Sequence, residues 1–268
     1  MTHDLARQIA DTRAARGSAV VWWLGQAGFA LKTPGGETVL VDPYLSDSCE
    51  REHGLKRLSA SPLNPDDARA DWVLFTHEHT DHLDPDAVRA IAANCPACRF
   101  AGPAGCSESL VSLGISPDRF TLLTPGATFD PGGFSVRAAS ADHGGYSPSA
   151  ATLRVEIDGL RILFTGDTSL RPDLITPLLD RPIDLLLPCI NGGFGNMGHI
   201  DAARLVQAVK PRFAAPCHFW TFAEQGAGDP WGFVQACKFL CPEVSARLLK
   251  PGEPFVVEAG SFSSSCRT

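Results

Sequence analysis

One nine-residue stretch, Thr76 to Asp84, constrains the chain more than any other part of the sequence. It reads T-H-E-H-T-D-H-L-D. Imidazole or carboxylate groups stand at His77, His79, Asp81 and His82, so that four side chains of metal-ligand type fall within six positions. A solvated loop rarely acquires such a density by chance. We therefore interpret the stretch as a metal-binding loop.

The spacing inside this loop suggests more than one ion. His77 and His79 alternate, so on an extended segment both side chains point the same way. Asp81 and His82 follow after the chain has had room to turn, which allows them to bind a second ion beside the first. One loop supplies too few ligands for a catalytic site, which also keeps an open position. Further ligand-type residues directly follow predicted strands, and these are His143, Asp167 and His218.

Short runs of β-branched, aromatic and aliphatic residues, separated by glycine and proline, predict strands throughout the chain. Asp158-Gly159 between two such runs is a strong signal for a two-residue hairpin. The expected strands are 20–24, 29–33, 38–41, 72–75, 99–101, 120–123, 134–139, 152–157, 160–164, 184–187 and 213–215.

Helices are expected after each block of strands. Asp84-Pro85 provides an N-cap followed by proline at the first helical position. The predicted helices are 85–93, 104–113, 173–179, 200–209 and 231–240; residues 1–17 are expected to be a covering helix or a loose arm, and 44–71 a loop. Two blocks of mixed strands with helices outside predict two sheets packed face to face in one domain spanning 1–268.

Composition and charge exclude several classes of protein. Charged residues make up 20% of the chain and apolar residues 44%, which is ordinary for a globular protein. A net charge of −7 without a basic cluster argues against nucleic acid as a partner. Charges near the N-terminus interrupt any signal peptide and no run is long enough for a membrane span, so we expect a cytoplasmic protein with no membrane partner. The odd count of nine cysteines favours reduced thiols.

Two short motifs suggest other functions at first sight. Gly193 to Gly198 satisfies G-x-G-x-x-G, but no acidic residue ends a following strand about 20 residues later, as a dinucleotide site requires. We interpret it as a flexible loop beside the metals or as plain loop structure. Cys95 and Cys98 form a C-x-x-C without a second pair, which favours structural thiols. The proposed substrate contacts are Asn191, Asn196 and His199 around the glycine loop and Trp220 near His218. The aromatic residues Tyr146, Phe194, Trp220 and Phe222 are either core or pocket lining.

The H-x-H-x-D-H pattern of the loop resembles the metallo-β-lactamase superfamily, and the resemblance runs from about Trp22 to Trp220. It implies an α/β protein with a four-layer αββα sandwich of two mixed sheets and outer helices. It also implies two metal sites joined by a bridging carboxylate: His77, His79 and His143 for one ion, Asp81, His82 and His218 for the other, and Asp167 between them. Asp42 would fix the loop from behind a metal-bound imidazole.

Within that superfamily, W-W-L-G-Q-A-G-F-A-L-K-T-P-G-G followed by V-D-P is similar to the branch that contains L-ascorbate-6-phosphate lactonase. The resemblance implies a hydrolase of a small molecule, with a lactone or a phosphorylated sugar-acid lactone as the first substrate class. Two divalent ions would activate a water and polarise the oxygen of the group it attacks. Imidazole and carboxylate ligands suit zinc first, and also manganese or iron. Asp81 and Asp167 are the candidate catalytic residues, with Asp81 guiding a proton toward the leaving group.

Two other functions stay open at this point. The same chemistry suits a phosphodiesterase acting on a small cyclic diester. A metal-containing binding or regulatory protein without turnover is the alternative from another class. A homo-oligomer is compatible with the sequence.

Overall fold

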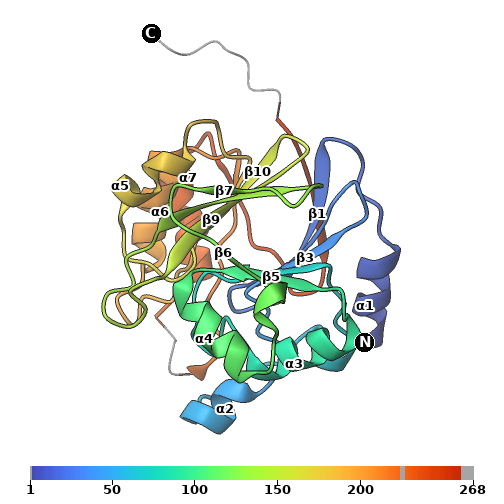
Figure 1. The fold of residues 1–268 in the computed structure, drawn as a ribbon. Coiled ribbons are helices and arrows are strands. Elements are labelled where there is room, and N and C mark those ends of the chain that lie inside the picture. Colours follow the sequence, from blue (N-terminus) through green and yellow to red (C-terminus); the bar gives the residue numbers. More distant parts are fainter. Residues whose placement is uncertain (1, 224–226, 261–268) are drawn as a thin grey trace.

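The computed structural model describes residues 2–223 and 227–260, in which two sheets of seven strands lie face to face (Figure 1). The first sheet begins at one edge with the last strand of the chain and then follows the sequence. Its strands, in spatial order, are β14 (Pro254–Glu258), β1 (Ser18–Gly25), β2 (Gly28–Lys32), β3 (Thr38–Val41), β4 (Trp72–Leu74), β5 (Arg99–Gly102) and β6 (Phe120–Leu122).

The second sheet contains the middle of the chain and its later strands. In spatial order its strands are β13 (Ser245–Ala246), β12 (Phe213–Ala214), β11 (Leu185–Leu187), β10 (Leu160–Phe164), β9 (Ala151–Ile157), β8 (Ser135–Ser140) and β7 (Thr128–Phe129). The turn between β9 and β10 confirms the predicted hairpin. Asp158 and Gly159 both have positive φ, at 46° and 85°, as a two-residue turn of this kind requires.

Each sheet combines antiparallel and parallel pairs in the same arrangement. From β14 to β3 the pairs are antiparallel, and from β3 to β6 they are parallel. From β7 to β10 the pairs are antiparallel, and from β10 to β13 they are parallel. The two sheets therefore share one pattern of strand pairing, although the sequence shows no internal repeat by inspection.

Strand β1 shows why the chain forms layers. Both of its faces are apolar, and successive side chains point to opposite faces. On one face, Ala19, Val21 and Trp23 enter the core between the two sheets. On the other face, Val20, Trp22 and Leu24 enter the core under the outer helices. A strand buried on both faces needs a layer on each side, which the second sheet and the helices provide.

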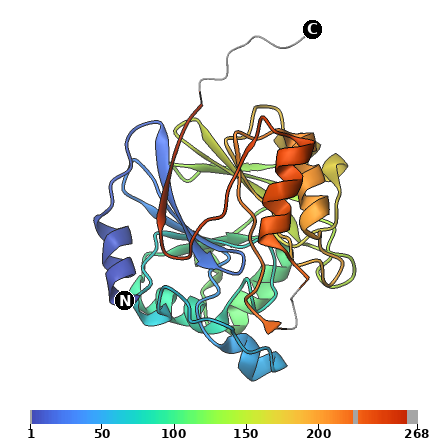
Figure 2. The same ribbon diagram turned by 180° about the vertical axis from the view of Figure 1, so that it is seen from behind.

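Helices cover the outer face of both sheets (Figures 1 and 2). Those packed on the first sheet are α1 (Thr2–Asp11), α3 (Pro85–Asn94) and α4 (Ala104–Ser112), and those on the second are α5 (Pro172–Ile175), α6 (His199–Val209) and α7 (Pro230–Leu240). Leu5 and Ile9 anchor α1, so the predicted N-terminal helix or arm is a packed helix. The predicted sandwich of two mixed sheets with outer helices is confirmed.

The prediction of a loop for residues 44–71 is wrong in part. The segment contains a six-residue helix, α2 (Ser48–His53), and a 3-10 turn at Pro65–Asp67. Both are too short to show helical periodicity. Strands β7, β13 and β14 were also not predicted. The helix predicted for 173–179 is split, because Pro177 has no N–H to continue it, into α5 and a 3-10 turn at Thr176–Leu178.

The cysteines of the described residues form no disulfide. Eight of them are free thiols, and Cys266 lies outside the described residues. Cys237 and Cys241 are buried in the core under α7. None of the helices within residues 2–223 and 227–260 is long and apolar enough to cross a bilayer.

Candidate metal centre

The predicted ligands gather at one edge of the sandwich because each follows the carboxyl end of a strand. The loop after β4 carries four of them. The other three, His143, Asp167 and His218, follow β8, β10 and β12, which run in the same direction as one another. The residues form three groups, and within each group the potential ligand atoms lie within 4.8 Å of one another. The groups are His77, His79 and His143; His77, His82 and Asp167; and Asp81, His82 and His218.

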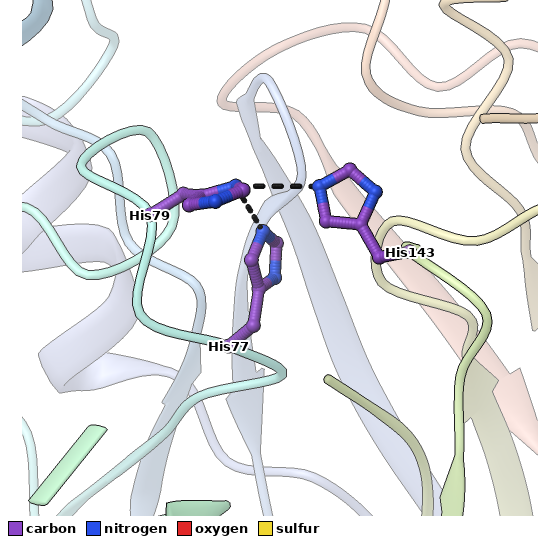
Figure 3. A group of neighbouring side chains, drawn as sticks. All are labelled: His77, His79 and His143. Carbon is purple, nitrogen blue, oxygen red and sulfur yellow. Dashed lines mark hydrogen bonds between the residues drawn. The ribbon is translucent and has the colours of Figure 1, made fainter. Parts of the chain in front are cut away.

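Three imidazoles form the first group, and their rings converge from two loops (Figure 3). His77 Nε2 lies 3.0 Å from His79 Nδ1, and His143 Nε2 lies 3.3 Å from the same nitrogen. His79 Nε2 lies 3.0 Å from the carbonyl oxygen of Tyr146, which accepts its hydrogen bond. Three ring nitrogens directed at one point are the arrangement that imidazoles adopt around a cation.

The second and third groups lie next to the first, and each contains one carboxylate. His82 Nε2 and His218 Nε2 lie 3.3 Å and 3.2 Å from Asp167 Oδ1. His218 Nε2 is also 3.3 Å from Asp81 Oδ2. Asp167 Oδ2 is 3.8 Å from His143 Nε2 in the first group. Asp167 therefore lies between His143 of the first group and His82 and His218 of the third, in the position predicted for a bridging ligand.

Asp42, directly after β3, forms hydrogen bonds to two residues of the metal loop, Thr76 and His82. Its Oδ2 lies 2.8 Å from His82 Nδ1 and accepts a 2.6 Å hydrogen bond from the Thr76 hydroxyl, while Oδ1 accepts the Thr76 N–H at 2.8 Å. A carboxylate can only accept, so His82 Nδ1 carries the proton. This hydrogen bond fixes the ring so that Nε2 is the nitrogen that faces Asp167 and the centre.

Gln26 also belongs to the centre, although it was not among the residues predicted from the sequence. Its side-chain Nε2 donates to Asp81 Oδ2 at 2.7 Å and lies 3.3 Å from His218 Nε2. Its carbonyl accepts the N–H of His218 at 2.8 Å. Gln26 follows the carboxyl end of β1, just as the predicted ligands follow their strands, and this position is the signal that could have revealed it.

The backbone is strained around the centre. Three of the seven non-glycine residues with positive φ in the described chain touch the site: Gln26, Asp42 and His218, at 49°, 44° and 59°. Such conformations cost roughly 1 to 2 kcal/mol per residue and cluster where function fixes a side chain.

Burial and charge act in opposite directions on the ionisable groups. Burial lowers the pKa of His77 well below its usual value. Burial would also lower the pKa of His218, but the carboxylates of Asp167 and Asp81 raise this pKa to about 9. The same carboxylates raise the pKa of His82 well above its usual value despite its burial. The neighbouring imidazoles lower the pKa of both carboxyls despite their burial. The centre thus contains two largely buried, ionised carboxylates, Asp81 and Asp167, whose negative charge favours a bound cation.

A pocket of about 400 Å³ lies over the centre. Four of the predicted ligands form its floor: His79, Asp81, His143 and Asp167. Its walls include Tyr146, Phe194 and, from α2 and the residue pair after it, Cys49, His53 and Leu55. The wall from α2 was missed because that segment was expected to be a loop. His53, which followed no predicted strand, thereby reaches the site.

The predicted substrate contacts are mostly elsewhere. Asn196 is buried and donates to Asp167 Oδ2 at 2.6 Å, so its amide positions a predicted ligand. Asn191, also buried, forms a β-bridge with Gly198. His199 begins α6, with its ring beside Gly232 of α7. Asn191, His199 and Trp220 are not among the residues that line the pocket over the centre.

The two remaining aromatic residues also lie outside this pocket. Trp220 lines a separate cavity of about 450 Å³ beside Trp23 and Phe219. Phe222 is a core residue, fully buried against Tyr44.

The donor set fits divalent transition metals. Imidazole nitrogens and carboxylate oxygens are the ligands that zinc, manganese and iron accept. His82 Nε2 and Asp167 Oδ1 are buried and have no hydrogen-bond partner among the described residues, although they lie 3.3 Å apart. Buried polar atoms are rarely left this way, and a bound ion would satisfy both.

Comparison with known proteins agrees with this geometry. The beta-lactamase superfamily domain matches residues 20–218. A UPF0173 metal-dependent hydrolase of Cupriavidus taiwanensis is 32% identical over 253 residues, covering 86% of this chain and 84% of that protein. A UPF0173 metal-dependent hydrolase of Anaeromyxobacter dehalogenans is 34% identical, covering 91% and 89%.

A solved structure adds evidence on the fold. A metallo hydrolase of the archaeon Ignicoccus hospitalis superposes with a TM-score of 0.70 at 21% identity, covering 90% of this chain and 99% of that one. The fold is therefore shared with a known metallo hydrolase structure. From the match over residues 20–218 and the two relatives above 30% identity, the chain belongs to the beta-lactamase superfamily and, within it, to the UPF0173 metal-dependent hydrolase family.

Proposed function

We propose that this metal-dependent hydrolase opens a small lactone or ester at a centre of two divalent metal ions. The observation that carries the proposal is the pair of adjoining ligand groups, three histidines in one and Asp81, His82 and His218 in the other, directly beneath a pocket. Zinc is the first candidate, and manganese or iron would suit the same donors. Ions held there would supply an activated water and polarise the carbonyl oxygen of the substrate.

The residues of the chain would each have a distinct task. His77, His79 and His143 would hold one ion, and Asp81, His82 and His218 the other, with Asp167 shared between them. Asp42 and Gln26 would fix the orientation of His82 and Asp81 through the hydrogen bonds that they form. Asn196 would do the same for Asp167. Such partners behind the ligands commonly decide how well a site holds its metal.

The size of the pocket and the similarity of the first strands support a small substrate. A volume of about 400 Å³ is typical of a small-molecule site. The segment Trp22 to Gly36 resembles the lactonase branch, so a lactone is the first substrate to test, and a phosphorylated sugar-acid lactone is one of its forms.

The proposal is tested by metal analysis combined with a substrate panel. Protein purified without added metal should contain close to two ions per chain by elemental mass spectrometry. The metal-loaded protein should hydrolyse at least one lactone or carboxylic ester faster than a chromogenic phosphodiester. Full metal content with no turnover on any member of the panel would contradict the proposal. Preference for the phosphodiester would favour a phosphodiesterase instead.

Asp81 is proposed to guide a proton from the attacking water to the leaving group, since it lies on the pocket floor beside His218. Asp81→Asn keeps the shape of the side chain and removes its basicity. We expect turnover to fall by at least about 100-fold, the usual contribution of a general acid or base. Variant protein that retains its metal and its turnover would eliminate this role.

A further inference from the structure

We propose that the substrate carries an uncharged apolar or aromatic substituent, which lies against a wall formed by Tyr146 and Phe194, and that it is not a phosphorylated compound. This inference rests on the proposed hydrolase function and narrows its substrate class. Three features of the pocket support it: the exposed aromatic wall, the strained backbone that presents Phe194, and the distribution of charge.

The wall leads from the centre to the pocket mouth. The Tyr146 ring lies 5.6 Å from that of the predicted ligand His143, and Phe194 meets Tyr146 edge to face at 6.1 Å. Both rings remain well exposed, at 60% for Tyr146 and 55% for Phe194, and both line the pocket. Exposed aromatic side chains around a pocket are the usual surface against which apolar ligand groups lose their hydration.

The backbone holds Phe194 in place at a cost. Phe194 has a φ of 54°, between Gly192 and Gly195 at 66° and 81°. The glycines adopt this region freely, whereas for a phenylalanine it is unfavourable. A bulky aromatic in this conformation, with its ring in the pocket wall, indicates that the loop presents the ring for a function.

The charges of the pocket oppose a phosphorylated substrate. No lysine or arginine is among the described residues that line it, whereas Glu78 is. The basic residues nearest in sequence to the α2 wall face other groups: Arg51 pairs with Asp86, and Lys56 lies 4.0 Å from Glu50. Phosphate groups are normally held by Arg, Lys or helix N-termini. A phosphate away from the metal ions would meet the Glu78 carboxylate, with no lysine or arginine in the lining to compensate it.

The first arm of the test compares substrates on metal-loaded protein. Phenyl acetate and an unsubstituted five-membered lactone represent the uncharged class, and a phosphorylated sugar-acid lactone represents the charged class. We expect kcat/KM to be at least about tenfold higher for an uncharged compound. Equal or higher kcat/KM for the phosphorylated lactone would overturn the inference while leaving the hydrolase function intact.

The second arm uses Phe194→Ala and Tyr146→Ala, with Phe239→Ala as the matched control. Phe239 lies on α7, is 86% exposed and does not line the pocket. The wall variants should raise KM for phenyl acetate by roughly tenfold, the effect of losing one apolar contact, with unchanged metal content. The control should match the wild type. Unchanged KM in both wall variants would overturn the inference.

A binding measurement separates this inference from the proposed function. Acetanilide is an uncharged amide analogue of phenyl acetate, and its dissociation constant is measured by calorimetry on metal-loaded protein. We expect it to bind the wild type and the Phe239 variant alike, and the two wall variants roughly tenfold more weakly. If no compound is hydrolysed but this difference is present, the hydrolase proposal fails and the aromatic wall stands. Equal binding by all variants refutes the wall.

Discussion

At the scale of a single residue, the Asp42 carboxylate determines which ring nitrogen of His82 faces the metal centre. Its two oxygens accept from Thr76 N–H, the Thr76 hydroxyl and His82 Nδ1. In Asp42→Asn one of these donors would face an amide N–H₂ in place of a carboxylate oxygen. If that donor is His82 Nδ1, the ring can accept from the amide only after its proton has moved from Nδ1 to Nε2. The protonated Nε2 then has no lone pair with which to bind a metal ion. We expect affinity for the ion proposed to bind Asp81, His82 and His218 to fall by about tenfold or more, measured by competition with a chromogenic chelator.

Asp158→Asn is the matched control for this prediction. Asp158 has a φ of 46°, against 44° for Asp42, so both substitutions place asparagine in the same backbone conformation. Asp158 lies in the exposed turn between β9 and β10, away from the metal loop. Its variant should keep the metal affinity of the wild type. A loss of affinity shared by both variants would point to backbone strain and against orientation of His82.

Most of the residues at the centre could be predicted from the sequence, because ligand-type side chains following strands meet at one edge of a sandwich. Gln26 could not be recognised by type, since an amide in a turn is ordinary. The substrate contacts were harder still. His199 was placed near the metals by its closeness in sequence to the glycine loop, but α6 turns its ring toward Gly232. Direction within a loop depends on backbone angles that the residue pattern does not encode.

At the scale of elements, Asp84 connects the metal loop to the pocket wall. It is fully buried. It caps α3 through the N–H groups of Asp86 and Ala87, and it also accepts from the backbone of Leu45 and Ser46 before α2. The N-cap was evident from Asp84-Pro85 in the sequence. The second set of bonds was not, because the segment 44–71 lacks any periodic signal.

Replacing this residue should therefore affect both stability and substrate binding. Asp84→Ala leaves buried N–H groups without partners, and we expect the free energy of unfolding to fall by about 3 kcal/mol. Because α2 contributes to the pocket wall, KM should rise while metal content is kept. Asp229→Ala removes the exposed cap of α7, one bond to Trp231 N–H, and should cost only about 1 kcal/mol without changing KM. Urea unfolding and steady-state kinetics distinguish the two variants.

At the scale of the whole molecule, strand direction explains why the centre forms where it does. In the first sheet β1, β3 and β4 run parallel, and Gln26, Asp42 and the metal loop follow their carboxyl ends. In the second sheet β8, β10 and β12 also run parallel, and the predicted ligands His143, Asp167 and His218 follow their carboxyl ends. The two blocks of strands predicted this arrangement. The two-residue strands β7 and β13 are too short to be visible as sequence runs. Strand β14 contains the run Phe255-Val256-Val257, which was not recognised as a strand.

Because each sheet supplies part of the ligand set, bound metal should fasten the two sheets together. Removing it would leave the buried carboxylates and imidazoles to face one another without a central cation. An ion present at about 1,000 times its dissociation constant contributes about 4 kcal/mol, which for a chain of this size corresponds to roughly 10 °C in Tm. We expect dialysis against a chelator to lower Tm by about that amount and added zinc to restore it. A variant carrying both His77→Ala and His218→Ala should have the same Tm with or without chelator. An unchanged Tm in the chelated wild type, with metal loss verified by elemental analysis, would show that the sheets are held by their apolar core alone.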